Sequence, residues 1–235
     1  MAKVLRRPGF NDSALIRLLA RLTDIDVPES KRDFADRLSQ WFSWTDAISL
    51  SSALNGPVAT APAAARGSAS AEEAECARVR AGLVSAIAEA GAASATADFA
   101  PYRQRYVARQ QAMETSIGRL RDRLRARLAA TSSTDEARLA SLDVVMEQVL
   151  GAHEQRLLAT VPALLHKHFE RLRKAHEAKL AEVQLALEGS DSDGVQPATW
   201  LEVFGKDMQG VLLAELDLRF QPVEGLLEAL RKRQQ

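Results

Sequence analysis

Several residue types that would mark a particular fold or site are scarce in this sequence. Cys76 is the single cysteine among 235 residues, which excludes a disulfide framework within the chain and a zinc site built on several thiolates. Aromatic residues make up 5% of the chain. β-Branched residues are also few, whereas the helix formers Ala and Leu are abundant, so the composition does not favour an all-β fold.

No excess of charge of one sign is present. Lys and Arg number 31 and Asp and Glu number 31, which gives a formal net charge of zero. The molecule as a whole therefore does not attract nucleic acid, an anionic membrane or an acidic substrate at long range. Any electrostatic recognition must come from a local cluster.

Long apolar runs are absent. The longest uncharged stretch is 47–65, and it contains Pro57 and Pro62, whereas a membrane-spanning helix needs about 20 mostly apolar residues. The basic N-terminus is not followed by a signal-peptide core, because Arg17 and Arg21 interrupt the first apolar segment. We expect a cytoplasmic protein, at most peripheral to the inner membrane.

What the sequence does contain is apolar residues repeated every three or four positions, which predicts helices. In residues 1–54, a break at Pro28 separates two such patterns and predicts an αα-hairpin module. The second pattern, read as one continuous helix, consists of Phe34, Leu38, Trp41, Thr45 and Ile48. Residues 55–70 are rich in Ala and Pro without an apolar period, which predicts a flexible linker.

The remaining residues predict three further segments. Residues 71–97 form an Ala-rich helix and a break, and residues 98–188 form a long helical hairpin, because two long helices with a short connection must pack antiparallel. Pro162 predicts a kink or break near Val161 in the second arm. Residues 189–235 are expected to form a helix pair interrupted at Gln221-Pro222.

Together these segments predict an all-α fold. Its centre is an elongated antiparallel helical hairpin with coiled-coil-like spacing, flanked by an N-terminal αα-hairpin and a C-terminal helix pair. No strand pattern interrupts this reading.

The catalytic and metal-binding motifs that parts of the sequence suggest are incomplete. His153-Glu154 and His176-Glu177 both begin like a zinc-protease helix, but the fourth position after each histidine is leucine. On a helical wheel the four histidines of the chain do not converge on one ion. His153 and His176 continue apolar stripes, which leaves a structural role or a pH response open. We predict no enzyme, no catalytic residue, no metal site and no cofactor.

The most conspicuous charge feature is an arginine row in the first arm of the long hairpin. Its members alternate with other residues: Arg119, Arg121, Arg123, Arg125 and Arg127. Three interpretations stay open: pairing with acids on a neighbouring helix, binding of phosphates or anionic lipid, or contact with an acidic protein. No aromatic side chains interleave with the row, so base stacking is not indicated.

Two tryptophans lie close together in the N-terminal module. Trp41 lies on the apolar stripe, which favours packing between the two helices. Trp44 lies off that stripe, and an exposed tryptophan is a frequent interface anchor. Both tryptophans and the arginine row are therefore candidate partner-binding residues.

Five segments give the chain a resemblance to a known group of proteins: Leu15–Asp24, Pro28–Ser30, Leu38–Ile48, Ala159–Glu170 and Leu213–Leu230. The chain resembles a bacterial family of proteins of unknown function over nearly its whole length, apart from the linker. The resemblance implies an accessory role in an envelope complex, beside a proton-channel component of the stator type and an outer-membrane peptidoglycan-anchoring protein. It supplies no catalytic residues.

The sequence therefore predicts a non-enzymatic helical scaffold or adaptor. We expect it to bind protein partners, possible envelope-complex components among them, or to self-associate through residues 98–188 while presenting Trp41 and Trp44. The alternative is a protein that binds nucleic acid or an anionic membrane surface through the arginine row. A third hypothesis, an enzyme with a site assembled from distant residues, has the fewest candidate groups.

Overall fold

The computed structural model describes residues 13–24, 39–56, 69–91, 97–131, 133–186 and 199–232. Seven helices occupy these ranges: α1 (Ala14–Thr23), α3 (Trp44–Asn55), α4 (Ala69–Gly91), α5 (Ala100–Ala129), α6 (Thr134–Leu158), α7 (Val161–Ala186) and α8 (Thr199–Lys232). The described ranges contain no strand, so the predicted all-α class is confirmed. Most of the predicted linker lies outside the described residues.

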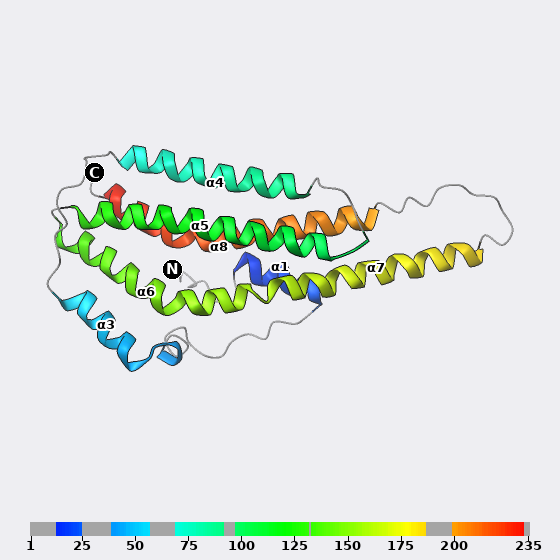
Figure 1. Cartoon of the computed structure of the whole chain (residues 1–235), viewed down its shortest axis with the longest axis horizontal. Coiled ribbons are helices and arrows are strands. Elements are labelled where there is room, and N and C mark those ends of the chain that lie inside the picture. The colour runs from blue at the N-terminus through cyan, green and yellow to red at the C-terminus, as the bar shows by residue number, and fades with distance from the viewer. Residues whose placement is uncertain are drawn as a thin grey trace, which may run out of the picture.

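The helices form one elongated bundle (Figure 1). α5 and α8 run side by side along its length, and α4 packs against both of them. α6 packs against α5 and α8, whereas α7 continues in nearly the same direction and extends beyond the other helices at one end. The long helices therefore share a single core instead of separating into a hairpin and a distinct C-terminal module.

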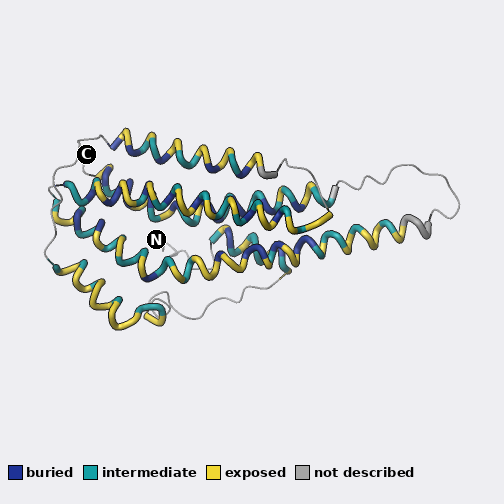
Figure 2. The backbone as a smooth tube through the Cα atoms, viewed as in Figure 1, coloured by how far each residue is buried: buried dark blue, intermediate teal, exposed yellow. Residues whose placement is uncertain are grey.

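The core lies where α5 and α8 meet (Figure 2). The stripe that the sequence predicts on α5 is buried: Tyr102, Tyr106, Met113, Ile117, Leu120, Leu124 and Leu128. The facing stripe of α8 includes Phe204, Met208, Val211, Leu212, Leu216, Phe220 and Val223. Side chains spaced three and four apart share one side of a helix, so the two stripes bury each other along most of their length.

The second arm of the predicted hairpin is divided into two helices. α6 ends at Leu158, and the backbone turns at Ala159 and Thr160 before α7 begins at Val161. Pro162 then occupies the second position of α7, where its missing N–H would have had no intrahelical partner. The break predicted near Val161 is therefore present.

The C-terminal helix pair is a wrong prediction, because α8 runs unbroken from Thr199 to Lys232 with Pro222 inside it. A proline in a helix interior costs about 3 kcal/mol. Phe220, Val223 and Leu226 flank the proline and are buried in the core. Their burial keeps the helix in one piece, since each large apolar side chain contributes about 1.5–3 kcal/mol.

The N-terminal helices also differ from the prediction. α1 packs on α7 and α8, whereas α3 packs on α6, so each of them contacts the bundle more than it contacts the other. The stripe from Phe34 to Ile48 is not one helix over its described part, because the helical turn at 39–41 ends before Phe42 and α3 begins at Trp44. Residues 25–38 lie outside the described residues.

Candidate functional site

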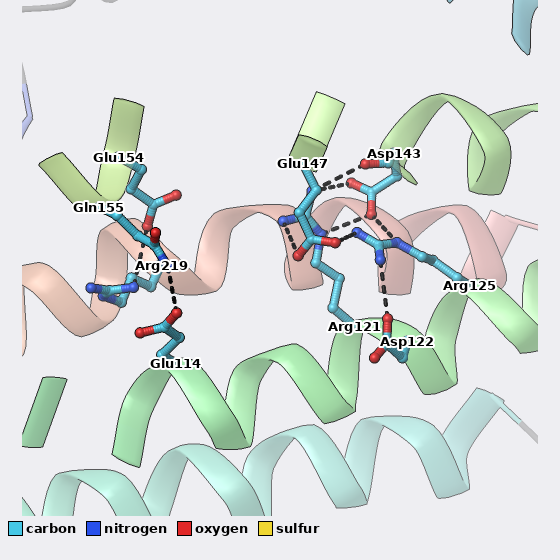
Figure 3. Close-up of polar contacts among 9 residues, drawn as sticks. All are labelled: Glu114, Arg121, Asp122, Arg125, Asp143, Glu147, Glu154, Gln155 and Arg219. Atoms are coloured by element: carbon cyan, nitrogen blue, oxygen red, sulfur yellow. Dashed lines mark hydrogen bonds and ion pairs between the residues drawn. The ribbon is translucent and has the colours of Figure 1, made fainter. Parts of the chain in front are cut away.

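Two members of the arginine row, Arg121 and Arg125, pair with carboxylates of α6 (Figure 3). Arg121 donates two hydrogen bonds to Asp143 on α6, from Nε at 2.8 Å and from Nη2 at 2.7 Å. Arg125 pairs with the same carboxylate through Nε at 2.6 Å and with Glu147 through Nη2 at 2.6 Å. Arg121 also reaches Glu147 at 3.1 Å. Two arginines one turn apart on α5 thus hold two carboxylates one turn apart on α6.

Protonation equilibria reflect this pairing. Burial would raise the pKa of Asp143, but the hydrogen bonds from Arg121 and Arg125 outweigh it, and the pKa lies below its ordinary value of 3.8. Burial likewise opposes the charge on Arg125, yet the bonds to Asp143 and Glu147 raise its pKa. Arg125 and Asp143 are therefore both charged at neutral pH.

The other members of the row point elsewhere. Arg123 Nε lies 2.8 Å from Glu72 on α4, and Arg127 Nε lies 3.5 Å from the same carboxylate. The Glu72 side chain is only 3% exposed, so α4 places a buried carboxylate against α5. Arg119 is exposed. Pairing with acids on neighbouring helices, one of the three interpretations of the row, is therefore what four of its five arginines do.

A capping box separates the two candidate tryptophans. The Ser43 hydroxyl accepts a hydrogen bond from the Asp46 backbone N–H at 3.2 Å, and the Asp46 carboxylate accepts one from the Ser43 N–H at 2.9 Å. Hydrogen bonding to Ser43 lowers the pKa of Asp46. The reciprocal bonds fix the first turn of α3 at Trp44. The pattern Ser-Trp-Thr-Asp was the signal that could have placed this helix start from the sequence.

Trp41 and Trp44 consequently have different surroundings. Trp41 is partly buried and stacks on His153 of α6, with ring centroids 5.1 Å apart and planes 25° apart. Trp44 is 83% exposed. On the same side of α3, one turn later, Ile48 is 52% exposed. The structure does not bring the tryptophans together, nor does it join them with the arginine row.

We call Trp44 and Ile48 the outer face of α3. Asp46 is the one charged residue of this helix, and it is partly buried. Leu54, farther along the helix, is also exposed, at 47%. The helix therefore presents large apolar side chains with only uncharged polar neighbours from its own sequence.

A buried polar cluster in the core escaped the sequence analysis. Glu215 of α8 is 0% exposed and accepts hydrogen bonds from Tyr106 Oη at 2.6 Å, Gln110 Nε2 at 3.0 Å and Arg219 Nε at 2.9 Å. Arg219 also lies 3.5 Å from Glu154 of α6. A glutamate on the apolar stripe of α8 was the available signal. The cluster links α5, α6 and α8.

Burial governs the protonation of this cluster. Burial raises the pKa of Tyr106, and the neighbouring charge of Glu215 raises it further. Burial also raises the pKa of Glu154, although Arg219 opposes that shift. Tyr106 is therefore protonated at neutral pH and donates its hydrogen bond to Glu215.

Metal binding and thiol chemistry find little support. In the part of the chain that the structure describes, no three His, Cys, Asp or Glu side chains are grouped so that they could hold a metal ion. Cys76 is buried in α4, and burial raises the pKa of its thiol, which disfavours the reactive thiolate.

None of the described helices is both long enough and apolar enough to span a membrane. A family model described as "Protein of unknown function (DUF3348)" matches residues 1–232. Comparison with curated proteins and with solved structures finds no match.

Proposed function

The chain belongs to the DUF3348 family, whose function is unknown, and we propose that it is a non-enzymatic helical adaptor that binds a protein partner through the outer face of α3. The exposure of Trp44, at 83%, is the observation that carries this proposal. Tryptophan is enriched among the residues that dominate protein–protein binding energy. An exposed tryptophan beside an exposed isoleucine favours burial against a partner.

The way in which α3 is held supports a presenting role. The stack of Trp41 on His153 and the contacts of α3 with α6 hold one side of the helix against the bundle. The capping box then orients Trp44 away from that contact. Because Asp46 is the one charged residue in α3, a partner would desolvate few charges on this helix.

The same geometry gives less support to residues 98–188 as the surface that binds a partner. The apolar stripe of α5 is buried within the chain, so it is not available to a second copy without opening the bundle. Self-association through that hairpin stays a prediction. The alternative function, anion binding by the arginine row, has less support, because Arg121, Arg123, Arg125 and Arg127 already pair with carboxylates.

The test is affinity capture of the full chain from its native cells with chemical cross-linking, followed by binding measurements with the purified partner. A double variant, Trp44→Ala with Ile48→Ala, is expected to lose the partner. Leu157→Ala is the matched control, because Leu157 is another exposed apolar residue, at 60%, on α6. The free energy of unfolding of both variants should lie within about 0.5 kcal/mol of the wild-type value, as is usual for surface substitutions.

Capture of the same partner at the same level by the double variant would refute the proposal.

The family resemblance of the sequence supports a finer proposal, which is an accessory role in a bacterial envelope complex. Recovery of an inner-membrane channel component or a peptidoglycan-anchoring protein would support it, whereas partners drawn from nucleic-acid complexes would contradict it.

A further inference from the structure

One group of cations differs from the arginine row in that no described carboxylate forms an ion pair with it. Lys167, Arg171 and Lys174 of α7 are exposed, and at about 100° per residue they lie within about 60° of one another around the helix. Among the described residues, no carboxylate forms an ion pair with any of the three. We call them the cationic ridge of α7.

The adjacent flank of the same helix shows the contrast. Glu170 lies 2.6 Å from Arg173 and 3.8 Å from His166, and Arg173 also lies 3.6 Å from Glu177. Glu170 and Glu177 are therefore both paired with Arg173 of the same flank. Within the described part of the chain, the ridge forms no ion pair with Glu170 although that residue is close in sequence.

Arg171 is held in place by a buried histidine. Its Nη2 lies 3.1 Å from Nδ1 of His168, and His168 Nε2 lies 2.8 Å from Asp207 Oδ2 of α8. A guanidinium can only donate, so Nδ1 must accept and Nε2–H must donate to Asp207. The imidazole is 3% exposed, and its contact with Asp207 holds it in the position from which Nδ1 orients Arg171.

The ridge borders an open concavity. Its volume is about 470 Å³, and the described residues that line it are His166, Lys167, Glu170, Arg171 and Lys174. His166 is itself stacked on Phe99 of α5, with ring centroids 4.6 Å apart. From Lys167 to Lys174 the helix rises by about 10.5 Å, which is wide enough for more than one phosphate group.

We propose that the cationic ridge of α7 binds phosphate groups, with Arg171 as the oriented donor and Lys167 and Lys174 as flanking charges. A planar guanidinium fork matches phosphate oxygens, and lysine adds charge-assisted hydrogen bonds. The phosphates could belong to a small soluble compound or to lipid headgroups, since the chemistry is shared. This site is separate from the outer face of α3 and does not depend on the proposed function.

Two probes test the site in the full chain at low salt. Isothermal titration with inorganic pyrophosphate reports soluble phosphate, and co-sedimentation with phosphatidylcholine vesicles, with and without phosphatidylglycerol, reports headgroups. Binding of pyrophosphate alone would assign the site to soluble phosphates, and binding of anionic vesicles alone would assign it to headgroups. Either result supports the proposal, whereas binding of neither probe overturns it.

Matched variants locate the binding. Replacing Lys167, Arg171 and Lys174 together by Gln should weaken binding at least about tenfold, the effect of losing one charge-assisted hydrogen bond. Arg78→Gln removes an exposed arginine of α4 that pairs with Glu75 and should leave binding within about twofold, because Arg78 lies outside the ridge and its charge is already paired. Equal binding by the triple variant and the wild type would overturn the proposal, and thermal melting confirms that each variant is folded.

Discussion

At the residue scale, the buried carboxylate of Glu215 is the most demanding feature of the core. A carboxylate removed from water destabilises the fold unless its oxygens receive hydrogen bonds. Tyr106, Gln110 and Arg219 supply them, and they come from two helices. The cluster therefore specifies how α5 and α8 are aligned, because a shift along the helix axis would separate the carboxylate from Tyr106 and Gln110 of α5.

Removing the Glu215 side chain should lower the free energy of unfolding more than removing one of its hydrogen-bond donors. Glu215→Ala leaves Arg219 buried without its closest partner and is expected to destabilise the fold by about 3–5 kcal/mol. Tyr106→Phe deletes one donor to a charged acceptor and should cost about 1.5–3 kcal/mol. Urea unfolding followed by circular dichroism measures both. Similar small losses for the two variants would show that the buried charge does not set the alignment.

Asp143 gives a prediction that depends on pH. Its pKa is lowered below 3.8 in the folded chain, so the stability it contributes is present above that value and is lost as the pH falls below it. Asp143→Asn should therefore destabilise the fold by about 3 kcal/mol at neutral pH. Unfolding measured from pH 7 to pH 3 should show the difference from the wild type shrinking toward the acid end. A constant difference would contradict this assignment.

At the element scale, the sequence predicts where helices lie better than where they stop. The periodic stripe of α5 and the break before Pro162 are both confirmed. The helix break at Pro222 was a wrong prediction because the free-energy cost of a proline within a helix was considered alone. The burial of Phe220 and Val223 on either side of it offsets that cost. The start of α3 was missed because the apolar stripe continues from Trp41 to Thr45, whereas the helix does not continue through Phe42 and Ser43.

The capping box of α3 should control that helix locally. Ser43→Ala removes the hydroxyl that accepts from the Asp46 N–H, while the backbone N–H of residue 43 keeps its bond to the Asp46 carboxylate. The loss should cost about 1 kcal/mol of helix stability. Since no residue of α3 is fully buried, the loss should appear as faster amide exchange in α3 and leave the exchange of α5 and α8 unchanged. Hydrogen exchange with mass spectrometry resolves the two. Faster exchange throughout the bundle would mean that α3 belongs to the cooperative core.

At the scale of the whole molecule, the sequence could not predict which helices pair. Helical spacing identifies an apolar side but not the helix that covers it, and the sequence therefore did not anticipate α4 and α8 packing along α5. The candidate site shows the same limit. Arg121 and Arg123 are two residues apart, yet one faces Asp143 on α6 and the other faces Glu72 on α4. Only the arrangement in space distinguishes an internal ion pair from an exposed charge.

Substitutions in the arginine row should therefore lower the stability of the fold before they affect any binding. Reversing Arg121, Arg123 and Arg125 to Glu places new carboxylates against Asp143, Glu147 and Glu72, two of which are largely buried, and breaking one buried pair already costs about 3–5 kcal/mol. That loss is comparable to the total stability of many domains, about 5–15 kcal/mol, so the triple variant should be unfolded or strongly destabilised. Arg119→Glu, on the exposed member of the same row, should change stability by no more than about 0.5 kcal/mol. Thermal unfolding of both variants tests this prediction. A triple variant as stable as the wild type would show that these arginines do not stabilise the fold, and it would favour a role for the row in binding.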